Sequence, residues 1–239
     1  MTRVVAIMQP TYLPYLGYFD LVNLSDTFVF LDDVQFERRS WQSRNRINPV
    51  GGVLMLTVPV KKHSQDTLIR DIEIADDQPW REKHLASIRH AYGGRPHFAD
   101  GWAFIEGQLT AERGPLLADL TCGLTEAAVR KMGLDTRIVR SGALGCEGRR
   151  SDRLLAICRA LGATEYLSTI GSKDYIDQEQ VFAQAGLPVR YKTFTPIPFP
   201  QGRPEFTPYM SFVDALMNVG WEGIRGLLAG YEAQLGSGA

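Results

Sequence analysis

The chain has 239 residues, a net charge of −1 at pH 7, 44% hydrophobic residues and 22% charged residues. This length and balance are typical of one globular domain, which we expect to span residues 1–239. A net charge this close to zero creates no long-range attraction to nucleic acid or to an anionic membrane, so we expect neither as a partner.

The first apolar run, Val4–Ile7, stops at Gln9-Pro10. It is too short for a signal peptide or for a spanning helix of roughly 20 apolar residues. Cys122, Cys146 and Cys158 are odd in number and lack CxxC spacing, which indicates neither a disulfide framework nor a zinc site. We therefore expect a cytoplasmic protein that needs no intrinsic cofactor.

Short β-branched runs predict the first strands. Val4–Ile7 and Thr27–Leu31 read as buried strands, with room between them for a short helix over Gly17–Leu24. This spacing favours a parallel β-α-β crossover. A third run, Val53–Val58, ends at Pro59 and predicts another strand.

The second half repeats one pattern three times: a helical segment ends at Gly, an apolar residue follows, and a strand begins. Gly accepts the left-handed conformation that terminates a helix. The helices are amphipathic, which indicates that they cover a parallel sheet. The three glycines precede the predicted strands Thr136–Val139, Glu165–Ser168 and Val189–Tyr191, and they are Gly133, Gly162 and Gly186.

Other segments fit this pattern less well. Within residues 61–115 the pattern predicts a helix from Trp80 to Tyr92, and His84 lies on its apolar face. Residues 194–208 carry five prolines, which indicates a long strap without regular structure. The tail from Ser211 to Leu235 is helical in pattern and is interrupted at Gly220. Together these elements predict an α/β fold: a Rossmann-like parallel sheet with helices on both faces and an inserted helical region around 61–115.

Parallel α/β sheets bind ligands beyond the carboxyl ends of their strands. Two such loops are rich in polar and aromatic residues, residues 8–19 and residues 32–46. The prolines and aromatics of the first loop form a stiff wall, so Gln9, Tyr12 and Tyr15 are candidate substrate-binding residues. In the second loop the polar candidates are Gln35, Arg44, Asn45 and Arg46, which can hold amide, phosphate or carboxylate groups.

The adjacent acids Asp32 and Asp33 are candidate catalytic residues, because two carboxylates at a strand end can raise the pKa of one of them. Arg38, Arg39, Arg44 and Arg46 are their expected cationic partners. An alternative stays open: strand-end Asp often caps the next turn, and Arg often pairs with such an acid for purely structural reasons.

Three further candidates carry equally open alternatives. Ser168 to Lys173 forms a loop whose amides and Lys173 can hold an anion, or an ordinary strand–helix turn. Tyr175 follows this loop. His84 is a candidate catalytic residue or a satisfied core histidine. No histidine has ligand spacing with acids or cysteines, so we expect no metal site.

These residues resemble the WbqC-like protein family over nearly the whole chain. The resemblance implies work on small activated intermediates, such as amino sugars, in O-antigen, other surface-glycan or natural-product biosynthesis. It is carried by Gln9-Pro10, Leu13-Pro14, Gly17–Asp20, Asp26, Leu31–Phe36, Arg44–Ile47 and Leu56–Pro59, and later by Trp80–His84, Tyr166–Ser168, Tyr175, Ser211, Asp214, Asn218 and Gly220.

The chain departs from the family pattern at two positions. The family usually has His directly before Gln-Pro, where this chain has Met8, and Ser-Gly where it has Ser168-Thr169. If that His is the general base of the family, this chain has lost it or uses another group. The second departure narrows the expected pocket.

The first functional hypothesis is a biosynthetic transferase. It moves an acyl or aminoacyl group, for example from a carrier-bound donor, to the amine of a nucleotide-linked amino sugar or similar small acceptor. Asp32 or Asp33 would deprotonate or orient the amine. The second is a non-catalytic protein that binds a nucleotide sugar or a partner enzyme. The third is RNA binding through residues 38–46, which predicts an affinity that falls steeply with salt.

Overall fold

The β-branched runs form the central sheet of the computed structural model, which describes residues 2–236. All five strands of this sheet are parallel, in the order β5-β2-β1-β6-β7. Their bounds are β1 Val4–Met8, β2 Thr27–Phe30, β5 Arg137–Arg140, β6 Glu165–Thr169 and β7 Val189–Lys192.

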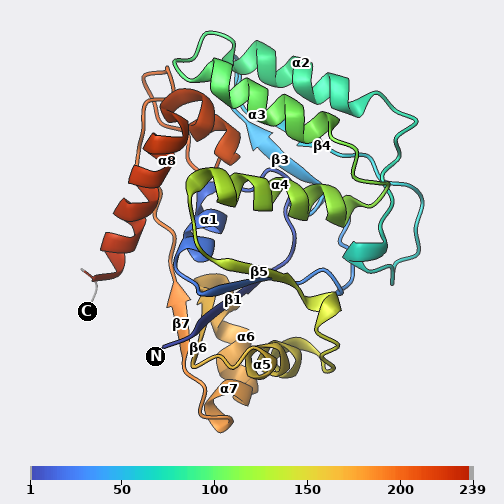
Figure 1. Ribbon diagram of the computed structural model, residues 1–239, viewed down its shortest axis with the longest axis vertical. Helices are drawn as coiled ribbons and strands as arrows, with labels where there is room; N and C mark the ends of the chain where they lie inside the picture. The colour runs from blue at the N-terminus through green and yellow to red at the C-terminus, as the bar shows by residue number, and fades with distance from the viewer. Residues whose placement is uncertain (1, 237–239) are drawn as a thin grey trace.

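Helices cover both faces of the sheet because successive strand residues point to opposite sides. Ala6, Phe28 and Leu167 belong to the core shared with α1 (Leu16–Asn23), α4 (Leu117–Met132) and α8 (Phe212–Gly236). Val5 and Tyr166 belong to the second core, with α5 (Arg150–Ala160), α6 (Lys173–Glu179) and α7 (Val181–Gln184). Figure 1 shows these two helical layers above and below the sheet.

The chain winds outward in two directions from the middle of the sheet. It passes from β1 through β2 to β5 on one side, then returns to β6 beside β1 and continues to β7. This is the Rossmann-type order, so the predicted fold class is confirmed. The three helix–Gly–strand units are also confirmed, with Gly133, Gly162 and Gly186 in the left-handed conformation.

The third predicted strand belongs elsewhere. Val53–Val58 yields β4 (Leu54–Thr57), which pairs antiparallel with β3 (Arg44–Ile47) in a separate two-stranded sheet. The loop after Val58 therefore does not lie at the carboxyl edge of the main sheet. Strand β3 was expected as loop because its sequence is polar, yet Asn45 and Ile47 are buried while Arg44 and Arg46 are partly exposed. That alternation is what a half-buried strand requires.

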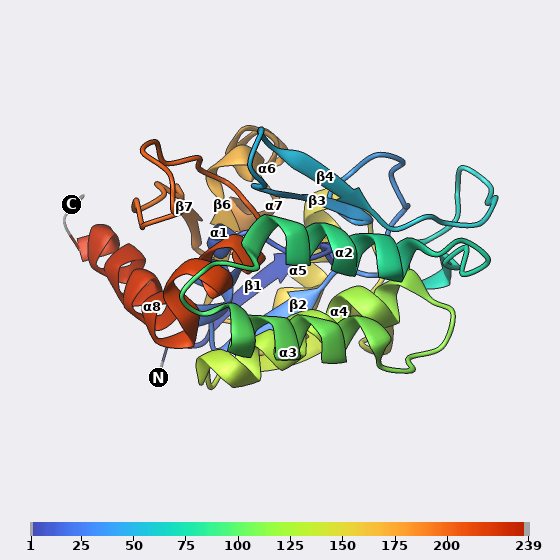
Figure 2. The same ribbon diagram turned by 90° about the horizontal axis from the view of Figure 1, so that it is seen from above.

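The inserted region is helical, as expected. It contains η1 (Ile69–Asp71), α2 (Trp80–Tyr92) and α3 (Phe98–Thr110), which pack with the hairpin against α4 and α8. Figure 2 shows α2 and α3 lying side by side next to the hairpin. Short 3₁₀ turns η2 (Ser141–Ala143) and η3 (Ile170–Ser172) follow β5 and β6. Of the helices in residues 2–236, none has the length and apolar character needed to cross a bilayer.

Helix α8 is broken at Gly220, as the sequence indicates. Gly220 has φ 68° and ψ −175°, values that only glycine adopts readily. A Cβ atom there would lie 2.6 Å from His97 Nδ1. The break therefore depends both on a left-handed backbone and on close approach of an imidazole ring.

We expect Gly220→Ala to lower the free energy of unfolding by at least about 2 kcal/mol, because it combines backbone strain with a ring clash. Urea denaturation measures the change. Gly226→Ala is the matched control, since Gly226 lies in the same helix with open space around it. That control should be neutral or stabilising by up to about 1 kcal/mol. Equal effects of the two substitutions would contradict this account of the break.

Candidate functional site

Two adjoining cavities open at the carboxyl ends of β1 and β6, where the strand order reverses. We call them the polar chamber, of about 330 Å³, and the aromatic chamber, of about 360 Å³. Met8, Thr11, Trp41 and Thr169 line both. The other residues of the polar chamber are Ile7, Gln9, Leu31, Glu37, Ser40, Gln42, Leu154, Tyr166, Ser168, Ser172 and Tyr175. Those of the aromatic chamber are Tyr15, Tyr18, Asn45, Arg46 and Tyr209.

One wall of the polar chamber carries a chain of hydroxyl groups. Ser168 Oγ lies 3.1 Å from Tyr166 Oη and 2.7 Å from Ser172 Oγ. Ser172 Oγ in turn donates to the Thr169 carbonyl over 2.8 Å. Each hydroxyl both donates and accepts, so this wall can bind either a donor or an acceptor on a ligand.

The polar chamber also presents an amide and a carboxylate. Gln42 Nε2 donates to Gln9 Oε1 over 2.9 Å, and Tyr18 Oη donates to the Gln9 carbonyl over 3.1 Å. Within residues 2–236 nothing accepts from Gln9 Nε2, which leaves both protons for a ligand. Glu37 is exposed, and its carboxylate has no ion-pair partner among the described residues. The chamber thus offers one oriented amide donor and one unpaired acid.

The aromatic chamber combines ring faces with one cation. Trp41 and Tyr209 are both 47% exposed, so their rings remain accessible. The Arg46 guanidinium lies 5.2 Å from the Trp41 ring centroid, and its Nη2 donates to the Tyr209 carbonyl over 3.1 Å. No carboxylate of the described chain pairs with Arg46. A cation held this way beside aromatic rings suits a ligand that joins a flat ring to an anionic group.

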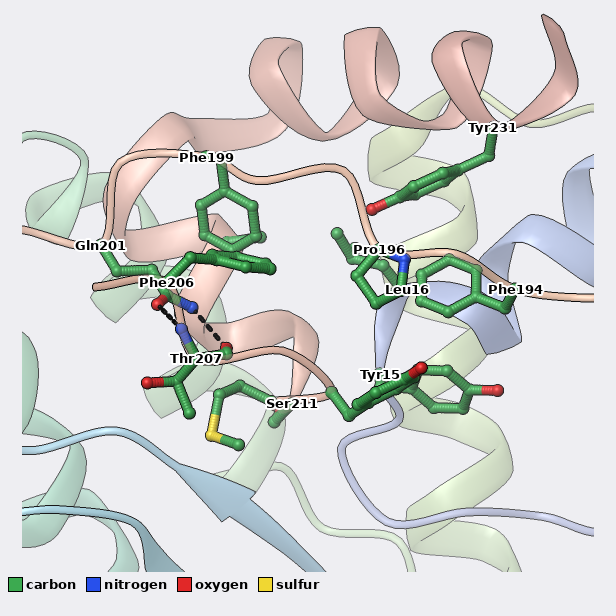
Figure 3. Close-up of a pocket in the computed structure, with 13 residues that line it drawn as sticks. Tyr15, Leu16, Phe194, Pro196, Phe199, Gln201, Phe206, Thr207, Ser211 and Tyr231 are labelled. Atoms are coloured by element: carbon green, nitrogen blue, oxygen red, sulfur yellow. Dashed lines mark hydrogen bonds between the residues drawn. The ribbon is translucent and has the colours of Figure 1, made fainter. Parts of the chain in front are cut away.

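The predicted strap extends in the structure over residues 193–210, all outside helix and strand, and it lines the aromatic chamber through Tyr209. Figure 3 shows the crevice beneath it, where the Tyr15 and Phe194 rings meet edge to face at 5.3 Å. The strap is fastened by Gln201, which donates to the Thr207 carbonyl and accepts from its N–H (Figure 3). The crevice holds only about 20 Å³, room for about one water molecule. It therefore serves as a packed wall of the site.

A buried acid holds the strap to the helical layer. Asp214 accepts from Tyr92 Oη over 3.0 Å and from Gln201 Nε2 over 2.7 Å. Tyr92 Oη also accepts from the Asn48 N–H at the end of β3. Burial raises the pKa of Asp214 to about 6. This network joins α2, α8, the hairpin and the strap, and so fixes the position of the chamber walls.

The paired acids are placed away from both chambers. Asp32 Oδ1 accepts from the Gly142 N–H over 3.0 Å and from Ser141 Oγ over 3.3 Å. Asp33 accepts from Ser141 Oγ and forms an ion pair with Arg153 of α5. The expected pairing with Arg38, Arg39, Arg44 or Arg46 is not formed within residues 2–236. Asp32 thus stabilises the turn after β5, as in the structural alternative, and a catalytic role for either acid stays a prediction.

His84 and Tyr12 meet in the core behind the hairpin. Tyr12 is fully buried, and its Oη lies 2.9 Å from His84 Nδ1. The His84 ring also bonds to the Thr57 backbone, and burial lowers its pKa to about 4. His84 is therefore neutral at pH 7. Neither residue lines either chamber. The catalytic role of His84 and the substrate-binding role of Tyr12 therefore stay predictions that the cavities do not support.

Of the remaining candidates, the structure brings Gln9, Ser168 and Tyr175 to the polar chamber and Tyr15, Asn45 and Arg46 to the aromatic chamber. Three lie elsewhere. Gln35 donates to the Gln65 carbonyl in a separate surface groove. Lys173 pairs with Asp177 beside the Tyr191 ring. Arg44 is partly buried and lines neither chamber.

Several lining residues were not singled out from the sequence. Glu37, Trp41 and Gln42 lie within the loop that was identified, and an aromatic residue among charges was an available signal for Trp41. Thr169 and Ser172 flank the Ser168 candidate. Tyr209 gave no signal, because only the tertiary fold returns the strap to β3. Within residues 2–236 no group of three or more His, Cys, Asp or Glu side chains is placed to hold a metal ion.

The fold and the site define a class: a Rossmann-type α/β protein with two adjoining cavities at the point where its strand order reverses. A family model described as the WbqC-like protein family matches residues 9–226. The chain therefore belongs to the WbqC-like family, as the sequence resemblance implied.

One relative is close in sequence. A Mycobacterium tuberculosis (strain ATCC 25618 / H37Rv) protein, whose name reads "Uncharacterized protein Rv1507c", is 32% identical over 220 residues, which cover 91% of this chain and 94% of that protein. No solved structure matches the chain.

The raised pKa of Asp214 makes stability depend on pH. A carboxyl whose pKa is about 6 in the folded protein and 3.8 in the reference state favours folding when protonated. This contribution is complete below about pH 4 and is lost as the pH rises through about 6. We therefore expect the stability of wild type relative to Asp214→Asn to fall by about 2 kcal/mol between pH 4 and pH 7. Denaturant unfolding across that range measures it, and a constant difference would contradict the assignment.

Proposed function

We propose that the chain is a biosynthetic transferase that joins an acyl or aminoacyl group to the amine of a small acceptor, such as a nucleotide-linked amino sugar, in the cytoplasm. The observation that carries the proposal is the pair of connected chambers at the reversal of strand order. A transferase must hold two different molecules with their reacting atoms in contact, and two chambers of different chemistry that share four lining residues meet that requirement.

The aromatic chamber suits the acceptor. A nucleotide-linked sugar has a flat base and a diphosphate, and this chamber has exposed rings and an Arg46 cation without a carboxylate partner. The polar chamber suits the reacting groups. Its Gln9 amide and Ser168 hydroxyl can bind the carbonyl of the donor, and Tyr175 lines the same chamber. Met8, at the junction, faces both ligands.

The chemical step is an aminolysis. The amine nitrogen attacks the carbonyl carbon of a thioester or ester donor, the new C–N bond forms and the C–S or C–O bond breaks. The carrier leaves as a thiol or alcohol once the proton lost by the nitrogen has been passed to it. The nitrogen must lose a proton, which a carboxylate can accept. Glu37 is the carboxylate that lines the polar chamber, and we assign it this role.

Glu37→Gln should lower kcat by about 10²-fold or more with little change in acceptor affinity, because Gln keeps the shape but cannot accept the proton. The assay mixes the purified chain with an S-acyl N-acetylcysteamine thioester and a uridine diphosphate amino sugar, and mass spectrometry detects the amide. Glu205→Gln, an exposed acid on the strap, is the matched control. Amide formation at the wild-type rate by Glu37→Gln would remove the assigned role.

The same assay tests the paired acids. If Asp32 and Asp33 act only through the turn and the Arg153 ion pair, Asp32→Asn with Asp33→Asn should lower the midpoint of thermal unfolding, while the folded fraction keeps its turnover. If either acid is catalytic, turnover falls at temperatures where the variant is fully folded. The two outcomes separate the structural role from the catalytic one.

A non-catalytic binding protein of the same pathways is the second candidate. It is favoured by Met8, a residue that carries no exchangeable proton, at the position where the family usually has His and where both chambers meet. Such a protein binds the nucleotide sugar and releases it unchanged.

Calorimetry with the uridine diphosphate amino sugar, followed by mass spectrometry of the ligand, distinguishes the two candidates. Saturable binding with no product in the presence of the thioester supports the binding protein. Amide product that accumulates beyond one equivalent of protein supports the transferase. Arg46→Met should weaken binding about tenfold under both candidates, because it removes the cation that faces the anionic group.

A further inference from the structure

A further groove lies outside the proposed site, between β4 and α2. It has a volume of about 310 Å³, and Figure 2 shows the two elements running beside each other. Leu56–Pro59 and Trp80–His84, two segments that carry the family resemblance and that the proposed site does not use, supply most of its walls. Its lining residues are Leu54–Thr57, Pro59, Gln78, Trp80, Lys83, His84 and Ser87.

The backbone of β4 leaves hydrogen-bonding groups free at this groove. In an antiparallel pair the N–H and C=O of one residue point to the same side, and the side alternates along the strand. The Val58 N–H donates to the Ser43 carbonyl, so Val58, and with it Leu56, faces β3. Met55 and Thr57 therefore turn their N–H and C=O groups away from β3, into the groove.

One of these outward groups is already bonded. The His84 ring of α2 is hydrogen bonded to the Thr57 backbone, and this bond raises the pKa of the ring. A hydrogen bond has that effect when the ring donates it, so the acceptor is the Thr57 carbonyl. This leaves the N–H and C=O of Met55 and the N–H of Thr57 without a backbone partner in residues 2–236. They are spaced as one antiparallel strand would need them.

Part of this edge is already covered, because Val60 pairs with Ile74 and His84 bonds to Thr57, so the open stretch is Met55 and the Thr57 N–H. Along that stretch no residue of the strand itself prevents pairing. Exposed edge strands are usually blunted by a charged residue, most often Lys, or by a proline in the strand. Residues 49–60 contain no charged residue, and the prolines lie at the two ends of the segment, outside β4. Val53, Leu54 and Met55 are 49%, 40% and 38% exposed. An uncharged, apolar, unpaired edge is a strand-binding surface.

Helix α2 decides what kind of strand fits. Suppose that a second copy paired its β4 with this one about a two-fold axis normal to the sheet. The buried Leu56 side chains of both copies would then lie on the same face of the joined sheet. Each copy would also have to place its own α2, which lines the same groove, beside the β4 of the other copy. A single extended peptide has no core beneath it and fits between β4 and the helix, a known mode of peptide recognition.

The charge of the groove indicates the composition of that peptide. Lys83 is the single ionised side chain among the lining residues, because His84 is neutral, and no carboxylate of the described chain pairs with it. We propose that the groove binds an extended peptide of a partner protein as an antiparallel strand on β4, with apolar side chains against Leu54 and Trp80 and a carboxylate at Lys83. This inference is independent of the proposed transferase.

Nuclear magnetic resonance of the full ¹⁵N-labelled chain tests it. The probes are acetyl-Val-Thr-Val-Glu-Val amide, the same peptide with Lys in place of Glu, and Val-Thr-Val-Val with a free carboxyl end. We expect a carboxylate-bearing peptide to shift the Met55 and Thr57 amides and to slow their hydrogen exchange at least about tenfold. The Glu peptide and the free carboxyl end distinguish a side-chain carboxylate from a terminal one.

Two variants locate the contact. Met55→Pro removes an outward N–H without touching the β3 ladder and should weaken binding about tenfold. Wild type should bind the Glu peptide about 2- to 5-fold more tightly than the Lys peptide, and Lys83→Glu should show the opposite preference of similar size. This substitution alters no backbone group. Lys131→Glu, at the far end of α4, is the matched charge control and should change neither affinity.

Three results would overturn the proposal. The first is that none of the peptides shifts the Met55 and Thr57 amide resonances. The second is that the shifts fall on other elements. The third is that these two amides already exchange slowly in the free protein and that the protein sediments as a dimer. The last result would assign the edge to a second copy.

Discussion

The structure depends on one topological constraint, the reversal of strand order between β1 and β6. The connection after β1 leads to β2 on one side of the sheet, and the connection after β6 leads to β7 on the other side. No crossover therefore covers the carboxyl ends of these two middle strands. The loop after β1 turns toward the hairpin and the loop after β6 turns toward α6. The space between them is filled by neither, and it is this space that the polar and aromatic chambers occupy.

The walls of that space are held by bonds that a ligand does not need to supply. Asn45 donates to the Tyr12 carbonyl and accepts from the Arg46 N–H, so a side chain of β3 fixes the loop after β1. Asp214 ties the strap to α2, and Arg46 ties Tyr209 to β3. A site fixed before binding loses less conformational entropy when the ligand arrives. The buried polar groups of this chain thus serve the site by positioning it.

The sequence predicts the fold well because its signals are local. The β-branched runs, the amphipathic helices and Gly133, Gly162 and Gly186 each report on their own neighbourhood, and the main sheet follows from them. The site is predicted in part. Gln9 and Tyr175 follow strands that meet at one edge and Ser168 lies at the end of one of them, so the rule for parallel sheets finds all three. The partners of Asp33 and the arrival of Tyr209 depend on contacts between distant segments, Arg153 and the strap, which no local pattern encodes. Strand β3 was missed because arginine hides its alternation.

The proposed small-molecule site and the proposed peptide-binding edge lie on different elements of the chain. The central claim is that the shared wall of the two chambers contacts the ligand. Thr169 lines both chambers, so Thr169→Trp should fill their junction. Calorimetry with the uridine diphosphate amino sugar is the most direct measurement. We expect Thr169→Trp to abolish the binding seen with wild type while the thermal unfolding midpoint stays within a few degrees; wild-type affinity in that variant would place the ligand elsewhere and contradict the account.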